Sequence, residues 1–302
     1  MNQIDQLAQL AEQAGCDVFH DEPMSLHTTF KIGGPADLFI SVYNRKAIQT
    51  LYRAANELGV SLMAIGNGSN MLVRDTGIRG AVIALAGDFR QIALTGETMV
   101  ECGAGATLAQ LCNFAKENSL TGLEFAWGIP GAAGGAAFMN AGAYNYEMES
   151  VLTACTHVTK EGEFGTLKGE ELQFGYRHSA YTENGSTILS LTLELEKGRK
   201  DQIERVMDDL YSRRKSKQPL EYPSAGSVFK RPVGNFAGTL IEKCGLKGKT
   251  VGGAMVSEKH AGFIVNVGGA TCEDVLRLID FIKETVLKQT GVALECEVKT
   301  FG

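Results

Sequence analysis

The first part of the chain contains apolar residues at helical spacing and also short apolar runs. Within residues 45–58 the period is three to four, giving one apolar face made of Ile48, Leu51, Tyr52, Ala55 and Leu58. The runs 36–42 and 61–65 on either side are short and apolar, which predicts strands and hence a β-α-β unit. Residues 1–15 also show helical spacing, among polar residues and without a basic start or a long apolar run. They predict a surface helix rather than a signal peptide, and no membrane insertion is expected anywhere in the chain.

Further along, the pattern predicts two domains that each mix helices and strands. A helix capped by Thr107 is expected at 107–118. Strands are expected at 81–85, 98–102, 151–159 and 188–195. Charged residues at 196–201 interrupt the pattern, so we expect a first domain at 1–199, with two α/β subdomains at about 1–85 and 86–199, and a second α+β domain at 200–302. Its expected elements are helices at 202–212, 239–244 and 273–289, an apolar run at 262–267 and a strand at 292–300.

Composition narrows the kinds of partner that the protein can have. The net charge is −6, with 29 basic and 35 acidic residues, so a nucleic-acid polymer is not expected and phosphate recognition must be local. The 7 cysteines are scattered and odd in number, as in a cytoplasmic protein with reduced thiols. Neither they nor the 5 histidines have metal-ligand spacing, so no metal is predicted. We expect a monomer.

Two glycine-rich loops carry the first candidate binding sites. One follows the strand at 61–65 and reads Gly66, Asn67, Gly68, Ser69, Asn70. The other contains Gly128, Ile129, Pro130, Gly131, Gly134 and Gly135, and leads to Asn140 and Gly142. Backbone N–H groups in such loops can surround a phosphate. Met71 and Leu108 stand where a dinucleotide fingerprint needs glycine, and Lys243 stands where a P-loop needs it, so neither a Rossmann domain nor an NTPase is predicted.

A third motif presents a hydroxyl beside positive charge. Residues 224–232 read SAGSVFKRP, which predicts a turn that exposes Ser227 with Lys230 and Arg231 close behind it. Taken alone, the motif indicates an anion-binding loop. A serine that bonds its own turn is the alternative reading, and for Arg177 the alternative is a surface arginine beside Tyr176.

Together these motifs resemble the UDP-N-acetylenolpyruvoylglucosamine reductase (MurB) family over almost the whole chain. The resemblance rests on GNGSN paired with GIPGAAGGA, on FGYR around Arg177, on SAGSVFKRP, and on LECEV around Glu297. It implies an FAD-binding domain of two subdomains, of the MurB and vanillyl-alcohol oxidase type, followed by a substrate-binding domain. The two glycine loops would hold the FAD pyrophosphate. The implied activity is reduction of UDP-N-acetylenolpyruvoylglucosamine to UDP-N-acetylmuramate by NADPH.

The resemblance also implies a role for each catalytic residue. Arg177 and Glu297 would polarise the substrate carboxylate, and Ser227 would donate a proton to carbon. Periodicity alone does not distinguish Glu297 from Glu295, since both lie on the same side of the expected strand. Tyr144, Lys217, Lys230, Arg231 and His260 are the implied substrate-binding residues.

This chain departs from longer members of the family at several positions. Arg231 stands where asparagine is common and His260 where glutamine is common. Only residues 178–226 lie between Arg177 and Ser227, too few for the inserted tyrosine loop of those members, so the chain resembles the shorter subgroup. Two other functions stay open: another FAD oxidoreductase of the same fold, and a non-catalytic protein that binds a UDP-sugar.

Overall fold

The computed structural model describes residues 2–302 and divides into two compact units, each with its own hydrophobic core. Unit 1 consists of residues 2–20, Leu38–Asn67 and Gly80–Ser212. Unit 2 consists of Asp21–Asp37, Gly68–Arg79 and Arg213–Gly302. The sequence analysis expected a domain boundary at 199–200. In the structure the chain passes from unit 1 to unit 2 between Ser212 and Arg213, inside a helix. Unit 2 also includes two N-terminal segments that the sequence assigned to the first domain.

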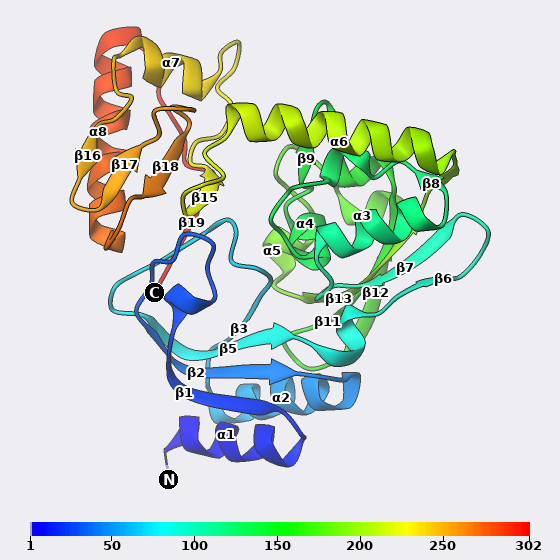
Figure 1. The fold of residues 1–302 in the computed structure, drawn as a ribbon. Coiled ribbons are helices and arrows are strands. Elements are labelled where there is room, and N and C mark those ends of the chain that lie inside the picture. The colour runs from blue at the N-terminus through cyan, green and yellow to red at the C-terminus, as the bar shows by residue number, and fades with distance from the viewer. Residues whose placement is uncertain (1) are drawn as a thin grey trace. The chain divides into compact units, whose positions relative to one another are not determined.

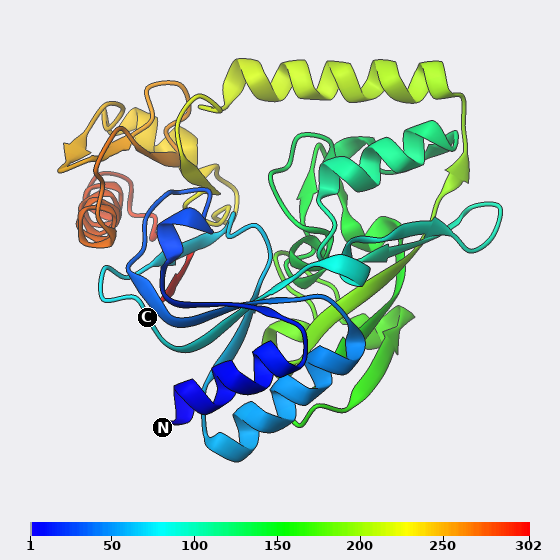
Figure 2. The same ribbon diagram turned by 60° about the horizontal axis from the view of Figure 1, so that its bottom comes forward.

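The first sheet of unit 1 has strand order β1-β2-β5-β3. Its strands are β1 (Asp17–Pro23), β2 (Pro35–Val42), β3 (Leu62–Ile65) and β5 (Ile78–Leu85), with β3 and β5 parallel. Helices α1 (Gln3–Gln13) and α2 (Arg45–Leu58) lie side by side against it (Figures 1 and 2). The expected β-α-β unit is therefore present, with β5 inserted between its two strands. Strand β1 was not predicted, because its sequence DVFHDEP lacks an apolar pattern.

The second sheet of unit 1 is antiparallel, with strand order β12-β11-β13-β7-β6. Its strands are β6 (Ile92–Leu94), β7 (Met99–Gly103), β11 (Leu152–Val158), β12 (Phe164–Lys168) and β13 (Thr187–Glu194). The remaining elements are helices α3 (Leu108–Glu117), α4 (Ala133–Phe138) and α5 (Tyr181–Asn184), and the short strands β8 (Leu120–Thr121), β9 (Gly142–Ala143), β10 (Tyr146–Glu147) and β14 (Glu196–Lys197). One apolar cluster runs through both sheets of unit 1.

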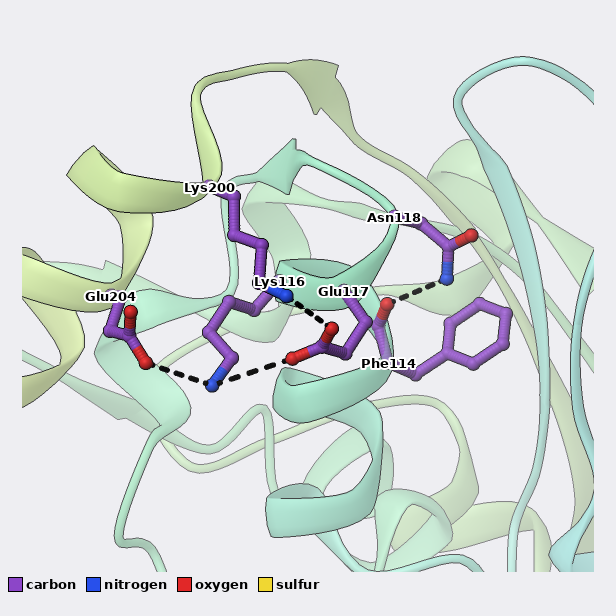
Figure 3. Close-up of polar contacts among 6 residues, drawn as sticks. All are labelled: Phe114, Lys116, Glu117, Asn118, Lys200 and Glu204. Atoms are coloured by element: carbon purple, nitrogen blue, oxygen red, sulfur yellow. Dashed lines mark hydrogen bonds and ion pairs between the residues drawn. The ribbon is translucent and has the colours of Figure 1, made fainter.

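Helix α6 (Lys200–Lys217) begins in unit 1, where ion pairs join it to α3 (Figure 3). Lys116 Nζ lies 3.3 Å from Glu204 Oε1 on α6, and Lys200 pairs with Glu117. The Asn118 side chain donates to the Phe114 carbonyl and so closes the end of α3. Because the carboxylates of these pairs are half exposed, the pairs are screened by water and contribute little to stability. Their effect is to fix where α6 starts.

Unit 2 is built on a sheet of strand order β15-β18-β17-β16 and on the long helix α8. Its elements are β4 (Met71–Val73), β15 (Ser224–Ser227), α7 (Ala237–Lys243), β16 (Thr250–Val251), β17 (Ala254–Val256), β18 (Phe263–Asn266), α8 (Cys272–Thr290) and β19 (Lys299–Phe301). Phe30, Ile32 and Leu72 from the N-terminal segments join its core. The Asp75 carboxylate accepts from the backbone N–H groups of Cys272 and Glu273 at the start of α8. These contacts explain why residues so early in the chain belong to unit 2.

Two predicted elements of the C-terminal part are wrong. The strand expected at 292–300 is reduced to β19, because residues 292–298 make only an isolated bridge, between Phe229 and Cys296. Ser227 was expected in a turn but is the last residue of β15. The bend is nevertheless present, since Gly226 has φ of +75° and the pairing of β15 with β18 shifts register between Ser224 and Ser227.

Candidate active site

The two glycine loops meet in unit 1. A Cβ built on Gly66 would lie 3.0 Å from Ala132 Cβ, so the two loops touch there although they are far apart in sequence. The second loop is held against residues 104–107: Ala133 N donates to Ala106 O at 2.7 Å, and Gly134 N donates to Ala104 O at 2.9 Å. Backbone contacts thus place the start of α4 beside the first loop.

The glycines of these loops serve two different purposes. Gly68 has φ of +58°, and a Cβ on it would lie 2.3 Å from the His27 carbonyl oxygen. A Cβ on Gly134 would lie 2.7 Å from Ala104 Cβ. By contrast, a Cβ on Gly135 would meet nothing within 4 Å, and Gly135 is exposed, like Gly66. Buried glycines therefore let the backbone pack closely, while exposed ones leave backbone open to a ligand, which fits a loop pair that holds a pyrophosphate.

A small hairpin follows α4. Strands β9 and β10 pair so that Gly142 lies opposite Glu147. The two turn residues, Tyr144 and Asn145, have φ of +55° and +68°, as a type I′ turn requires. The Tyr144 hydroxyl donates to the Leu210 carbonyl of α6 at 2.8 Å. In this structure the hydroxyl of this predicted substrate-binding residue therefore holds a helix of its own unit.

Arg177 lies in a tight turn of the same unit. Gly175 and His178 exchange both backbone hydrogen bonds, each 3.1 Å long, so Tyr176 and Arg177 form a two-residue loop. Arg177 has φ of +56°, which costs a non-glycine residue about 1–2 kcal/mol. Strain of this kind concentrates at functional sites. The guanidinium lies 5.2 Å from the centre of the Tyr176 ring, and its Nη1 lies 3.9 Å from Glu147 Oε1.

Ser227 and Glu297 come together in unit 2. Val228, the residue after Ser227, accepts a hydrogen bond from Glu297 N at 2.7 Å through its carbonyl oxygen. Ser227 is half-buried, and its hydroxyl makes no hydrogen bond to any of residues 2–302. The alternative reading, a serine that bonds its own turn, is therefore not what the structure has. Asn70, in the part of the first glycine loop that belongs to unit 2, donates through Nδ2 to the Glu297 carbonyl at 3.3 Å.

Glu295 and Glu297, which periodicity alone did not distinguish, have different surroundings in the structure. Glu295 is exposed and forms an ion pair with Lys230, and its carbonyl accepts from Lys230 N at 2.8 Å. Glu297 is half-buried and lies between Val228 and Asn70. Lys230 is therefore occupied by the outer glutamate, which supports Glu297 as the residue nearer to Ser227.

Two more cationic or ionisable groups lie near this segment. The pKa of Lys299 is lowered by burial and by the positive charge of Lys230. The imidazole of His260 accepts at Nδ1 from Gly262 N at 3.1 Å, and the Gly262 carbonyl accepts from Val228 N. Burial lowers the pKa of His260. A neutral ring then carries its proton on Nε2.

The other predicted substrate-binding residues are exposed. Arg231 stacks on Phe236, with 4.1 Å between its Cζ and the ring centre, and Lys217 is the last residue of α6. Sequence reasoning did not single out Glu147 or Lys299. Among residues 2–302 no group of three or more histidine, cysteine, aspartate or glutamate side chains is arranged to hold a metal ion. No helix in that range has the length and apolarity needed to cross a membrane.

Comparison with known proteins defines first a class and then a family. Residues 36–168 match the model of an FAD binding domain, and residues 218–301 match the model of the UDP-N-acetylenolpyruvoylglucosamine reductase C-terminal domain. The chain is thus a flavoprotein in which an FAD-binding domain precedes a reductase C-terminal domain. It belongs to the UDP-N-acetylenolpyruvoylglucosamine reductase family, and the expected α+β fold is confirmed.

Individual relatives agree over nearly the full length. The chain is 51% identical over 282 residues to the UDP-N-acetylenolpyruvoylglucosamine reductase of Latilactobacillus sakei, covering 93% of this chain and 92% of the relative. It is 47% identical to that of Streptococcus pneumoniae, covering 95% of each. The crystal structure of the reductase (MurB) from Thermus caldophilus matches with a TM-score of 0.82 at 36% identity, covering 95% of this chain and 99% of that one.

Proposed function

We propose that this protein reduces UDP-N-acetylenolpyruvoylglucosamine to UDP-N-acetylmuramate, a step of peptidoglycan precursor synthesis, with NADPH as the reductant and FAD as the redox cofactor. The single observation that carries the proposal is the pairing of the Ser227 and Glu297 segments through the bond from Glu297 N to Val228 O in unit 2. Family membership supplies the substrate class.

The residues that would hold FAD are those of the two glycine loops. Gly66, Asn67 and Gly135 present exposed backbone, and Gly68 and Gly134 let the loops pack tightly enough to do so. When bound, FAD would supply the chemistry of hydride transfer between NADPH and the methylene carbon of the enolpyruvyl group. The remaining positions that we assign to FAD binding are Ser69, Asn70, Gly128, Ile129, Pro130, Gly131 and Gly142. Asn140 is fully buried and bonded to Glu147, Gly175 and Glu149, so it would support this site without touching the cofactor.

The protein's own residues complete the reaction by supplying a proton and stabilising charge. Hydride addition to the methylene carbon pushes electrons of the carbon–carbon double bond toward the substrate carboxylate. Arg177 and Glu297 stabilise the charge that develops there, a contribution that commonly amounts to several kcal/mol. Ser227 then donates its hydroxyl proton to the adjacent carbon, which completes the lactyl ether.

The surroundings of Ser227 support its role as an acid. A serine hydroxyl is a weak acid, so it needs positive charge nearby and protection from water. Ser227 is half-buried and its hydroxyl is not held by another protein group of residues 2–302. Lys230 follows Ser227 by three residues and lies close enough to Lys299 for its charge to lower the pKa of Lys299, so two lysines stand in this part of unit 2, one of them paired with Glu295.

We assign the rest of the substrate to Tyr144, Lys217, Lys230, Arg231 and His260. Lys217 is exposed at the end of α6 and carries a charge suited to the diphosphate. His260 can donate from Nε2, because its Nδ1 accepts from Gly262. We further propose that the enzyme works as a monomer in the cytoplasm, which fits the free thiols of its cysteines.

An anaerobic half-reaction tests the function directly. The purified yellow protein is photoreduced without NADPH and mixed with UDP-N-acetylenolpyruvoylglucosamine, and the flavin absorbance near its oxidised maximum is followed. We expect rapid reoxidation with formation of UDP-N-acetylmuramate. Reduced protein that stays reduced would refute the function and favour another flavin oxidoreductase. A colourless preparation that still binds a UDP-sugar would favour a binding protein.

A further inference from the structure

Glu147 connects the segment of Asn140 with that of Arg177. One of its carboxylate oxygens, Oε2, accepts from Asn140 Nδ2 at 3.0 Å, and the other, Oε1, lies 3.9 Å from Arg177 Nη1. All three residues belong to unit 1. The Arg177 side chain is 20% exposed and that of Glu147 is 35% exposed, so the pair is partly shielded from water. A charge contact of this kind is less screened than a surface pair.

Asn140 is fixed on both sides, which makes it a rigid support for Glu147. It is fully buried, and its Nδ2 also donates to the Gly175 carbonyl at 3.1 Å, in the turn that carries Arg177. Its Oδ1 accepts from Glu149 N at 2.9 Å, directly after the hairpin that carries Glu147. One amide side chain therefore holds the base of the Arg177 turn and the Glu147 carboxylate together.

The hairpin leaves space for the Glu147 side chain by means of a glycine. Gly142 lies opposite Glu147 in the pairing of β9 with β10, and a Cβ on Gly142 would lie 2.5 Å from the Tyr146 carbonyl oxygen and 2.6 Å from Glu147 Cγ. Any larger residue at this position would press on the backbone of β10 as well as on the glutamate. Gly142 thus has a packing reason that is independent of any contact with a cofactor.

We propose that Glu147 is a positioning residue for the reductase reaction, which orients the Arg177 guanidinium toward the substrate carboxylate. At 3.9 Å the contact is too long for an N–H···O hydrogen bond, so it attracts the guanidinium without occupying an N–H donor in that contact. Asn140 fixes the carboxylate, and the carboxylate aims the arginine. The inference rests on the proposed function, because it assigns Arg177 to the substrate carboxylate.

The test compares Glu147→Gln with Glu149→Gln in the FAD-loaded enzyme. Glutamine at 147 keeps an oxygen for Asn140 but removes the charge that faces Arg177. Glu149 is an exposed neighbour that contacts Asn140 through its backbone, so its variant removes one charge and leaves the network intact. Both half-reactions are measured by anaerobic stopped flow: flavin reduction by NADPH, and reoxidation by the enolpyruvyl substrate.

We expect Glu147→Gln to slow reoxidation by about 10- to 100-fold, the usual effect of losing a group that orients a functional side chain. Flavin reduction should stay within twofold of the wild type, and kcat should fall more than KM changes. In an Arg177→Lys background the same substitution should cost much less, because the two residues act as one unit.

Three results would overturn the inference. The first is reoxidation in Glu147→Gln as fast as in Glu149→Gln, and the second is equal slowing of both half-reactions. The third is that Glu147→Gln slows reoxidation as much in the Arg177→Lys enzyme as it does in the wild type. Failure of the wild type to be reoxidised is a different outcome. It would refute the proposed function and this inference with it, whereas a reoxidising wild type with an unaffected Glu147→Gln would refute the inference alone.

Discussion

Adjacent glycines of α4 offer a direct test of how the second loop works. A methyl group added at Gly134 would lie 2.7 Å from Ala104 Cβ, about 1 Å inside the normal separation of two carbon atoms. Ala104 is buried in the core of unit 1, so neither side can move freely. A methyl group added at Gly135 meets nothing within 4 Å. The same substitution therefore has opposite consequences at neighbouring positions.

The magnitudes follow from two terms. Overpacking of a core costs about 1–3 kcal/mol, and alanine is favoured over glycine inside a helix by about 0.5–1 kcal/mol. From the midpoints of these two ranges, Gly134→Ala should destabilise the FAD-free protein by about 1 kcal/mol. Gly135→Ala should stabilise it by up to about 1 kcal/mol. FAD binding should reverse the benefit of Gly135→Ala, because the exposed backbone at Gly135 is where we place the cofactor. A methyl group there should weaken FAD binding at least tenfold, which is about 1.4 kcal/mol.

Urea unfolding and FAD titration separate these effects. The one tryptophan of the chain, Trp127, lies in unit 1 just before the second loop and reports its unfolding by fluorescence. FAD affinity is measured by quenching of flavin fluorescence. The reasoning is refuted if Gly134→Ala is as stable as the wild type, or if Gly135→Ala binds FAD as tightly as the wild type does.

Three further predictions concern single side chains. Ser227→Ala should leave flavin reduction by NADPH intact and slow reoxidation by substrate about 10²- to 10⁴-fold; equal slowing of both half-reactions in stopped flow would reject its role as proton donor. Glu297→Gln should lower kcat about 10²- to 10³-fold, while Glu295→Gln, which removes only the exposed partner of Lys230, should stay within threefold; similar losses in steady-state assays would contradict the assignment. Burial lowers the pKa of His157, so the unfolded chain takes up a proton that the folded protein excludes, and stability should fall as pH drops below about 6.5. His157→Gln should be less stable at pH 7.5 by urea unfolding but lose less on acidification to pH 5.5, and an unchanged pH dependence would show that other groups cause it.

Local periodicity predicted the individual elements of the fold well, because it depends on neighbouring residues. The helix at 45–58 has the same bounds in the structure, and Thr107 caps α3 as expected. The strand at 292–300 failed because alternation shows which side chains turn inward but not whether a partner strand is present. The assignment of 21–37 and 68–79 to unit 2 depends on contacts with residues about 200 positions away, which no local pattern records.

In the candidate site, too, local motifs were predicted from the sequence, whereas contacts between distant segments were not. Motif resemblance selected Ser227, Arg177 and Glu297, and in the structure one backbone bond joins Glu297 to Val228, the residue after Ser227. Glu147 was missed, because it reaches Asn140 through a hairpin whose turn residues, tyrosine and asparagine, give a weak turn signal, and it meets Arg177 only through a tertiary contact. Two residues with positive φ in succession leave no mark in a hydrophobic pattern. Once the hairpin is known, the facing of Gly142 and Glu147 follows from its register.

The division of the chain between the two units has a consequence for how the protein is made. Residues 21–37 and 68–79 leave the ribosome early, but their partners in unit 2 lie in residues 213–302. At about 5–20 residues per second, synthesis of residues 80–302 takes on the order of 10 to 45 s. Until residues 213–302 have been made, Phe30, Ile32 and Leu72 have no unit 2 core to enter, even after unit 1 is complete at residue 212. A nascent chain in this interval exposes an apolar surface that chaperones can bind, so slow translation should increase its dependence on them.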